Sequence, residues 1–364
     1  MLIFFIVVTG LHLAVMVLLS VAHLRHRRPP PADRQLPLSV IIAARNEEEN
    51  LGRNLPYVLE QAYDGPFEVI VVLDRCTDAS AEVVAGLQAA YANLRAVVVD
   101  EVPEGWAPKK WALHQGIAAA KHDHFAFTDA DCRPEKAWLE GLNRHFAAGK
   151  ELVLGFGPYA RYPGPLNLLI QFETGFTAFL YLSLTFLRFP YMAVGRNLGY
   201  TRAFFERAGG FDAIAGRLSG DDDLLVNQHA VPGKTGLMTG SDTLSWSEPE
   251  RNFRDWMAQK IRHLSAGTGY TTISQLILSG IHGLHAIFYL SLIGVLFFAG
   301  SPEWAGIVYV LRTLVLAACL STGKLFQTDW RWLPFFPLLD VGYLLYQSFL
   351  VPASLIFEPK WRGK

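Results

Sequence analysis

The sequence is poor in charge, and the charges that it has nearly cancel. Charged residues make up 18% of the 364 residues, and the formal net charge is −1. Proteins that bind nucleic acid need a basic face, so this balance argues against nucleic acid as a partner. Three cysteines are present, Cys76, Cys132 and Cys319, and their spacing fits neither a metal-binding motif nor a disulfide framework. We therefore expect free thiols and a reducing compartment.

Hydrophobic residues, 51% of the chain, are concentrated at its two ends. Residues 2–21 are almost all apolar and are followed by a basic cluster at positions 23–28. A secretory signal peptide carries its charge before the apolar run, so the order here is reversed. The run is long enough to cross a bilayer, and the arginines after it favour the cytoplasm for that end. We predict an uncleaved anchor over residues 1–24, then a basic, proline-rich linker over residues 25–37.

Beyond the linker, short apolar runs alternate with amphipathic segments of helical period. Strands are predicted at residues 39–43, 67–73, 94–99 and 124–128, and helices at residues 47–63, 78–91, 109–120 and 135–146. Strands that alternate with helices of crossover length predict an α/β fold with a doubly wound, mostly parallel sheet.

Residues 166–192 form an apolar, aromatic-rich stretch that interrupts this alternation. Glu173 makes a membrane span costly there, because a carboxylate inside lipid is expensive. We therefore favour a helix that lies in the membrane interface, with a buried core helix as the alternative.

Apolar runs return at residues 281–300, 304–322 and 334–357. The first two are predicted membrane spans joined by a short turn. The third contains Asp340 and several prolines, and as a complete span it would leave the basic tail, residues 360–364, outside the cell. That outcome opposes the positive-inside tendency. The sequence therefore leaves open whether residues 281–357 contain two spans or three.

Two carboxylates, Asp129 and Asp131, stand one residue apart directly after a predicted buried strand. Open α/β sheets bind ligands at the carboxyl ends of their strands. Carboxylate oxygens at this place suit Mg²⁺ or Mn²⁺ bound together with the phosphates of a ligand. The alternative is that they only cap the helix that follows. Glu47 and Asp74 follow neighbouring strands and converge on the same crevice, which weakens that alternative.

Five short motifs follow one another between residues 38 and 267: "SVIIAARNEE", "VVLDRCTDAS", "TDADCRP", "GDDDLL" and "QKIRHL". In this order they resemble the motifs of membrane-anchored family 2 glycosyltransferases. The resemblance implies a GT-A fold over residues 38–267, flanked by transmembrane helices. It also implies an inverting, metal-dependent glycosyltransferase. Such an enzyme moves a sugar from a nucleotide-sugar donor, with UDP-sugars favoured, to a membrane-embedded and lipid-linked acceptor.

The same resemblance assigns roles to single residues. The positions that match donor contacts are Glu47, Asp74, Lys109, Lys110, Asp129, Gln259 and Arg262. Asp131, together with Asp129, matches the site of a divalent metal, Mn²⁺ or Mg²⁺. That metal would offset the negative charge that develops on the leaving nucleoside diphosphate.

The motif "GDDDLL" matches the general base. Asp221 aligns with the base of the family, and Asp222 stays open because Gly220 stands where many relatives have Glu. A carboxylate on the far face of the sugar would deprotonate the acceptor hydroxyl, and this direct displacement inverts the anomeric centre. Acceptor-side contacts are expected from Arg196, Asn197 and Asp223.

Two other functions are compatible with these motifs. A processive polysaccharide synthase is the nearer alternative, although His263 stands where processive synthases carry Trp. A membrane subunit that binds nucleotide sugars without catalysis is the more distant one, and the intact acidic motifs argue against it. We expect an integral protein of the cell or inner membrane, with its catalytic domain in the cytoplasm.

Overall fold

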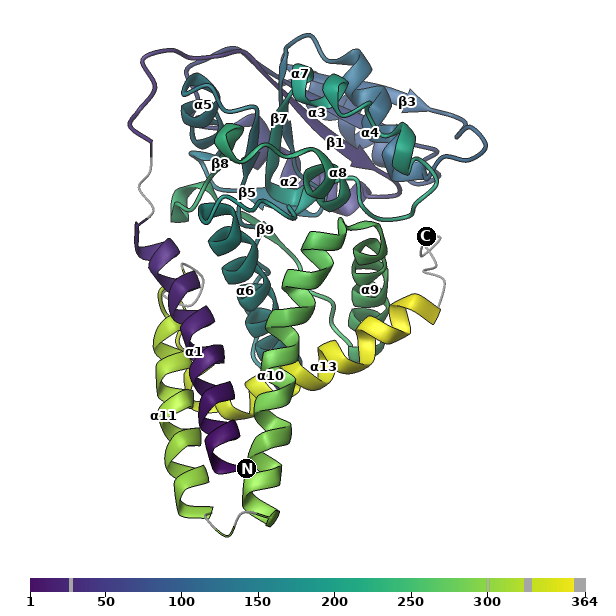
Figure 1. Cartoon of the computed structure of the whole chain (residues 1–364). Coiled ribbons are helices and arrows are strands. Elements are labelled where there is room, and N and C mark those ends of the chain that lie inside the picture. The colour runs from purple at the N-terminus through teal and green to yellow at the C-terminus, as the bar shows by residue number, and fades with distance from the viewer. Residues whose placement is uncertain (26–28, 299, 301, 324–328, 357–364) are drawn as a thin grey trace. The chain divides into compact units, whose positions relative to one another are not determined.

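The computed structural model describes all residues except 26–28, 299, 301, 324–328 and 357–364 (Figure 1). The chain forms two compact units. An α/β unit comprises residues 27–160 and 190–250, and a helical unit comprises residues 1–26, 161–189 and 251–357. Most of the basic cluster after the first helix and the whole basic tail lie outside the described residues.

A seven-stranded mixed sheet forms the centre of the α/β unit, in the order β3-β2-β1-β4-β7-β6-β8. Its strands are β1 (Leu38–Ala44), β2 (Phe67–Asp74), β3 (Leu94–Val99), β4 (His124–Phe127), β6 (Leu152–Leu154), β7 (Leu198–Thr201) and β8 (Thr235–Leu237). The first four strands pair in parallel, as predicted, whereas β7 runs antiparallel to both β4 and β6. The mostly parallel sheet is thus confirmed, and the reversed strand β7 was not anticipated.

Helices flank this sheet and bury its strands. They are α2 (Glu48–Leu59), α3 (Ser80–Gln88), α4 (Pro108–Ala119), α5 (Trp138–Ala147), α7 (Arg202–Arg207) and α8 (Asp223–His229). β1 and β2 are buried almost throughout, which is typical of parallel strands covered on both faces and explains their continuous apolar runs. A short antiparallel ribbon, β5 (Cys132–Pro134) with β9 (Ser245–Ser247), lies beside the sheet.

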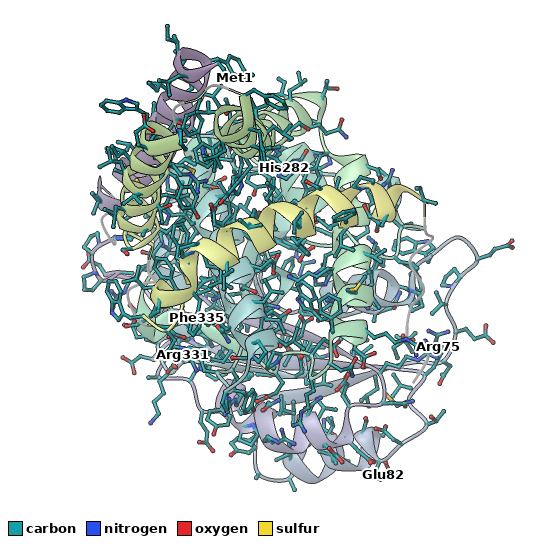
Figure 2. The ribbon with its side chains drawn as sticks, turned by 90° about the horizontal axis from the view of Figure 1, so that it is seen from below. Met1, Arg75, Glu82, His282, Arg331 and Phe335 are labelled. Atoms are coloured by element: carbon teal, nitrogen blue, oxygen red, sulfur yellow. The ribbon has the colours of Figure 1, made fainter. Side chains whose placement is uncertain are left out.

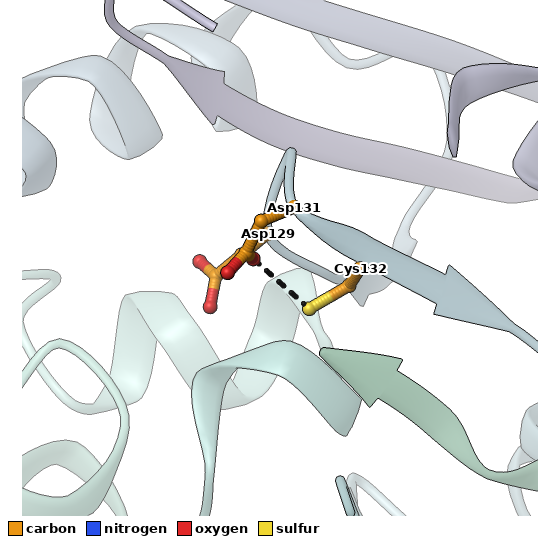
Figure 3. A group of neighbouring side chains, drawn as sticks. All are labelled: Asp129, Asp131 and Cys132. Atoms are coloured by element: carbon orange, nitrogen blue, oxygen red, sulfur yellow. Dashed lines mark hydrogen bonds between the residues drawn. The ribbon is translucent and has the colours of Figure 1, made fainter. Parts of the chain in front are cut away.

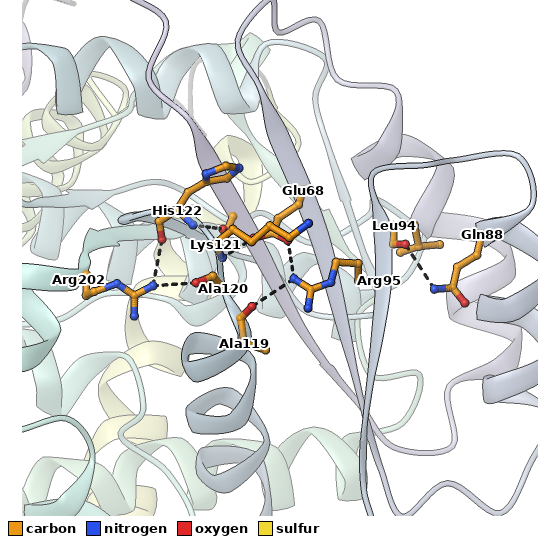
Figure 4. A network of polar contacts seen from close by, with 10 residues as sticks. Glu68, Gln88, Leu94, Arg95, Ala119, Ala120, Lys121, His122 and Arg202 are labelled. Atoms are coloured by element: carbon orange, nitrogen blue, oxygen red, sulfur yellow. Dashed lines mark hydrogen bonds and ion pairs between the residues drawn. The ribbon is translucent and has the colours of Figure 1, made fainter.

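A buried carboxylate, Glu68, ties together the amino ends of the central strands (Figure 4). Its oxygens accept hydrogen bonds from Ser39 Oγ (2.8 Å), Arg95 Nη1 (2.8 Å) and the amide of Lys121 (2.7 Å). Burial alone would raise the pKa of Glu68, but the Lys121 amide and Arg95 lower it below its ordinary value. This network holds the central strands together at their amino ends. The acidic motifs follow the opposite, carboxyl ends of the strands.

The helical unit contains α1 (Leu2–Arg25), α6 (Pro165–Phe186), α9 (Phe253–Ser265), α10 (Thr272–Phe298), α11 (Pro302–Leu320) and α13 (Phe336–Ile356). Five of these six, all except α9, are long and apolar enough to cross a membrane. α1, α10 and α11 lie side by side (Figure 1). Phe5 of α1, Phe288 of α10 and Ala305 of α11 belong to their shared core.

The predicted helix over residues 166–192 is shorter than expected. α6 ends at Phe186, and the chain turns at Arg188, whose φ of 66° is left-handed. Most of α6 is enclosed in protein, with 83% of its most apolar window buried. This enclosure fits the core-helix alternative rather than a helix lying on the membrane surface.

Candidate active site

The loop after β4 brings the two carboxylates of the "TDADCRP" motif together. Ligand atoms of Asp129, Asp131 and Cys132 all lie within 4.8 Å of one another (Figure 3). Ser247 Oγ donates to Asp131 Oδ2 at 3.0 Å, so the β5–β9 ribbon orients this side chain. Burial, and then the charge of Asp129, raise the pKa of Asp131. A divalent cation would relieve this repulsion, and the two carboxylates supply the hard oxygen ligands that it prefers.

Cys132 takes a different part in this group. Its thiol is buried and donates to Asp131 Oδ1 at 3.3 Å, and like Cys76 and Cys319 it is free. Burial, followed by the charges of Asp131 and Asp129, raises the pKa of the thiol well above its ordinary value. Since a metal binds the thiolate, Cys132 serves as a hydrogen-bond donor, and the two carboxylates are the candidate metal ligands.

Lys109, in the first turn of α4, connects these carboxylates to the "GDDDLL" motif. Its Nζ lies 2.9 Å from Asp129 Oδ1 and 3.4 Å from Asp221 Oδ2. Burial would lower the pKa of Lys109, but Asp129 and then Asp221 raise it well above its ordinary value. Two motifs that are about 90 residues apart in sequence therefore meet around one ammonium group.

Asp221 and Asp222 are neighbours with opposite electrostatic surroundings. Burial would raise the pKa of Asp221, but Lys109 and then Lys110 lower it. Burial, and then the charge of Asp221, raise the pKa of Asp222 to about 6. Asp222 is also held in place, because its Oδ2 accepts from the amide of Gly195 at 2.6 Å and its Oδ1 from the amide of Asp223 at 2.7 Å. Of these two neighbours, Asp222 is the one whose pKa is moved toward neutral pH.

Lys110 fixes the backbone that leads into these acids. Its Nζ donates to the carbonyl oxygens of Arg217 (2.5 Å) and Ser219 (2.8 Å), and the side chain is 1% exposed. Gly220 follows with a left-handed φ of 100°, where a Cβ would lie 2.4 Å from Leu224. The turn therefore favours glycine at this position. The buried ammonium of Lys110 is thus engaged by the loop, and the donor contact expected for it stays a prediction.

Glu47 and Asp74 lie at the same edge of the sheet, after β1 and at the end of β2. The Asp74 carboxylate is paired with Arg75 through bonds of 2.8 and 3.1 Å. Asn46 Oδ1 accepts from the amide of Thr77 at 2.8 Å, so the two loops are joined. Asn46 and Arg75 have left-handed φ values of 55° and 48°, a strain that concentrates at functional sites. Sequence reasoning missed both, although their positions beside motif acids could have indicated them.

The three residues expected on the acceptor side differ in their surroundings. Arg196 lies over the ring of Tyr159, with its guanidinium carbon 4.3 Å from the ring centroid. Asn197 is fully buried, donates to two backbone carbonyls at 2.7 and 3.0 Å and accepts from Trp138 Nε1 at 3.0 Å. The amide of Asn197 thus holds backbone segments together, and the acceptor contact expected for it stays a prediction. Asp223 is buried at the start of α8.

Gln259 and Arg262 lie on α9 of the helical unit. That helix buries Trp256 and Lys260, which are four residues apart and share one face. At 100° per residue, Gln259 and Arg262 fall away from this buried stripe. Within the motif "QKIRHL", Lys260 is therefore buried, whereas Gln259 and Arg262 lie on another face of the helix.

Comparison with known families gives two matches. The family described as "Glycosyl transferase family 2" matches residues 39–206, and "Glycosyl transferase family group 2" matches residues 124–349. The second match covers more than half of the chain.

Individual relatives are similar over shorter segments. Glycosyltransferase AglE of Haloferax volcanii is 34% identical over 120 residues, which are 32% of this chain and 38% of that protein. The 4,4'-diaponeurosporenoate glycosyltransferase of Staphylococcus aureus is 33% identical over 143 residues, which are 39% of this chain and 35% of that protein. The chain thus matches little more than a third of the length of these relatives.

One solved structure is similar over almost the whole chain. It is the mannosyltransferase PcManGT from Pyrobaculum calidifontis in complex with GDP-Man and Mn²⁺, with a TM-score of 0.58 and 18% sequence identity. The alignment covers 96% of this chain and 97% of that one. At this identity the similarity establishes the fold.

Proposed function

The chain belongs to the family 2 glycosyltransferases, and from that premise we propose that it transfers a sugar from a nucleotide-sugar donor to a lipid acceptor with inversion. One observation carries the proposal: Lys109 Nζ lies 2.9 Å from Asp129 and 3.4 Å from Asp221. A direct displacement needs a group that holds the leaving diphosphate and a base for the acceptor, both in one site. Lys109 marks the place where the two groups of acids meet.

On the donor side, Asp129 and Asp131 would hold a divalent cation, Mn²⁺ or Mg²⁺. When bound, it would supply positive charge opposite the leaving diphosphate. Lys109 adds a permanent positive charge to the same place, because its pKa is raised. The similarly folded mannosyltransferase was solved with GDP-Man and Mn²⁺, which agrees with this arrangement.

The remaining donor contacts keep the roles that the motifs suggest. Glu47 and Asp74 would contact the nucleoside, since both lie at the strand-end edge that also carries Asp129. Gln259 and Arg262 keep the donor contacts that the motif resemblance implies for them. UDP-sugars remain the favoured donors from the sequence motifs, and a GDP-sugar is the first alternative for the screen below.

We assign the general base to Asp222 and not to Asp221, which is the residue that aligns with the base of the family. A base works best when its pKa is near the working pH, and the pKa of Asp222 is raised to about 6. Two amide donors fix its carboxylate, so it is oriented before the acceptor arrives. Asp221 shares Lys109 with Asp129 and has a lowered pKa, which suits a residue that holds the donor side.

The acceptor is proposed to be a membrane lipid or a lipid-linked sugar. Five helices long and apolar enough to cross a membrane accompany the catalytic motifs. One relative is named for 4,4'-diaponeurosporenoate, which supports a lipid acceptor. We place the catalytic domain, residues 38–267, in the cytoplasm, where the arginines after residues 1–24 and the linker 25–37 would hold it.

A donor and acceptor screen tests this proposal. The full-length chain in lipid nanodiscs is supplied with Mn²⁺, one radiolabelled UDP- or GDP-sugar at a time, and membrane lipid extract. We expect single-sugar transfer into the lipid fraction, loss of transfer in EDTA, and loss in Asp222→Asn. A ladder of long products would indicate a processive synthase instead. Donor binding without transfer to any extract would contradict an enzyme.

A further inference from the structure

The helix α13 carries a stripe of exposed apolar residues, and its one carboxylate is buried. Its most exposed large residues are Leu338, Leu345, Phe349 and Ile356, which are spaced by seven, four and seven positions and therefore share one face. Asp340, the helix's one charged residue, is 2% exposed. A long exposed stripe of this kind needs an apolar partner. The sequence left open whether this segment is a third C-terminal span.

The direction of the neighbouring helices can be read from their contacts. A Cβ at Gly294, near the end of α10, would lie 3.2 Å from Met1 Sδ, so α10 ends beside the start of α1. Ser20 Oγ donates to the carbonyl of Cys319 at 3.2 Å, so α11 ends beside the end of α1. α1, α10 and α11 thus alternate in direction, as three successive spans do.

α13 does not join this alternation. Figure 1 shows it running across α10 and not alongside the three helices, and the view turned by 90° in Figure 2 shows α13 lengthwise. α13 packs mainly on α9 and makes smaller contacts with α6 and α10. Ser348 Oγ lies 3.3 Å from His282 Nε2 of α10, which marks the crossing.

Its main partner, α9, is a polar helix. Its 13 residues, FRDWMAQKIRHLS, include charges that a helix inside hydrocarbon would not carry. The ring of Tyr346 of α13 lies 5.3 Å from that of Trp256 of α9. Tyr346 also donates to Glu173 of α6 at 3.4 Å, and Glu173 is paired with Lys260 of α9. The middle of α13 is thus fixed to α9. Because α9 is polar, we expect it at the membrane boundary and the middle of α13 at the same depth.

The first turns of α13 are fixed to the spans themselves. Asp340 forms an ion pair with Arg312 of α11, accepts from Tyr289 Oη at 2.7 Å and has Oδ1 3.1 Å from His285 Nε2 of α10. The guanidinium of Arg312 also lies 4.5 Å from the ring centroid of Phe288. Arg312 is near the middle of its helix, so this end of α13 reaches into the bundle.

We propose that α13 is a re-entrant helix: it dips into one leaflet as far as Asp340, returns to the same surface, and presents the stripe from Leu338 to Ile356 to lipid. The proposal rests on the membrane insertion stated under the proposed function. It leaves three spans, α1, α10 and α11. Ile356, the last residue of α13, then lies on the same side as the end of α1, and a sequence that is basic after both points agrees with the positive-inside tendency.

A protease-protection experiment on the full-length chain tests the topology. Epitope tags are placed in the linker 29–37, beside Glu303 in the turn between α10 and α11, and at the C-terminus, one tag per variant. In sealed inverted vesicles we expect protease to remove the linker and C-terminal tags and to spare the Glu303 tag. Protection of the C-terminal tag together with the Glu303 tag would show that α13 crosses, and would overturn the proposal.

A depth measurement tests the lipid contact without any enzymatic readout, so its failure is distinct from failure of the proposed function. Nitroxides are attached at Leu338→Cys, Leu345→Cys and Phe349→Cys after the three native cysteines are replaced by serine. Collision with oxygen and with a nickel chelate reports depth in phosphatidylethanolamine–phosphatidylglycerol vesicles. We expect depth to decrease steadily from 338 to 349. Greatest depth at 345 would indicate a span.

A matched control is Tyr343→Cys, because Tyr343 is buried on the opposite face. Its label should meet neither oxygen nor nickel. Labels on the stripe that are equally inaccessible would indicate a second copy of the chain in place of lipid, and would refute the proposed lipid surface.

Discussion

The two units of the molecule surround their carboxylates in opposite ways. In the α/β unit, Asp129, Asp131, Asp221 and Asp222 crowd together, and Lys109 is shared between two of them. In the helical unit, Glu173 and Asp340 each have a cation of their own, Lys260 and Arg312.

The difference separates two uses of buried charge. Crowded acids keep a surplus of negative potential, which raises the pKa of Asp131 and Asp222 and is available to a cation or a proton. Acids that are paired one to one neutralise their partners and join helices. Glu173 joins α6 to α9, and Asp340 joins α13 to α11. Four predictions test this contrast, from the largest expected effect to the smallest.

Removal of the base should give the largest effect. We expect Asp222→Asn to lower turnover by about two to four orders of magnitude, the usual range for a general base, with little change in donor KM. Asp221→Asn should lower turnover less than Asp222→Asn does. It should raise the donor KM, because the ion pair between Asp221 and Lys109 is lost. Steady-state kinetics with varied donor checks both. Asp64→Asn, at an exposed position, is the control. If Asp221→Asn lost more turnover than Asp222→Asn, Asp221 would be the general base.

A broken pair in the helical unit should cost stability. Lys260→Met leaves Glu173 charged and buried, which typically costs about 3–5 kcal/mol, and Glu173→Gln in the same chain should recover most of it. Unfolding titrations in mixed micelles give these free energies.

The exposed pair of Lys234 with Glu151 in the α/β unit provides a matched comparison. Lys234→Met should cost less than about 1 kcal/mol, because water screens an exposed pair. If Lys260→Met were as mild as Lys234→Met, the pairing in the helical unit would not contribute to its assembly.

Metal should stabilise the crowded acids. At a Mn²⁺ concentration 100 times its Kd, the wild-type chain should gain about 2.7 kcal/mol, measured as a thermal shift, and EDTA should reverse the gain. Asp131→Asn should show no gain, whereas Asp64→Asn should respond like wild type. A full gain in Asp131→Asn would place the metal elsewhere.

The smallest effect concerns pH. Asp222 accepts a proton from the acceptor in its charged form, so turnover should fall as pH drops through about 6, the raised pKa of this group. Lys110 interacts electrostatically with Asp222 as well as with Asp221, and it also holds the loop before both acids. Lys110→Met should therefore lower turnover and move the acid limb upward by about half a pH unit to one unit.

Lys110→Arg and Lys150→Met are the controls for that shift. Arginine keeps the charge and the carbonyl donors, so it should restore part of the wild-type profile. Lys150 also donates to a backbone carbonyl, but at an exposed site, and its loss should leave the profile unchanged. If the acid limb moved as far in Lys150→Met as in Lys110→Met, the shift would not come from the position of Lys110 beside the acids.

The strand pattern and the acidic motifs could be predicted because they are local. β1 to β4 are short apolar runs, and the loops after them carry the polar residues, so parallel pairing places those loops at one edge. β7 could not be predicted in this way. It reverses direction between β4 and β6, and such a pairing depends on partners that are far away in sequence.

The sequence by itself determined the class of fold, the strand-end acids and the apolar segments, because each depends on the spacing of residues within one short stretch. The tertiary structure decided which charge meets which. Glu173 looked too costly for an apolar helix until Lys260 was found beside it, 87 positions along the chain. Lys109 and Lys110 look equivalent in sequence, yet one joins two acids and the other holds a loop. Electrostatic energy depends on distance in space, and distance in space is set by the whole fold.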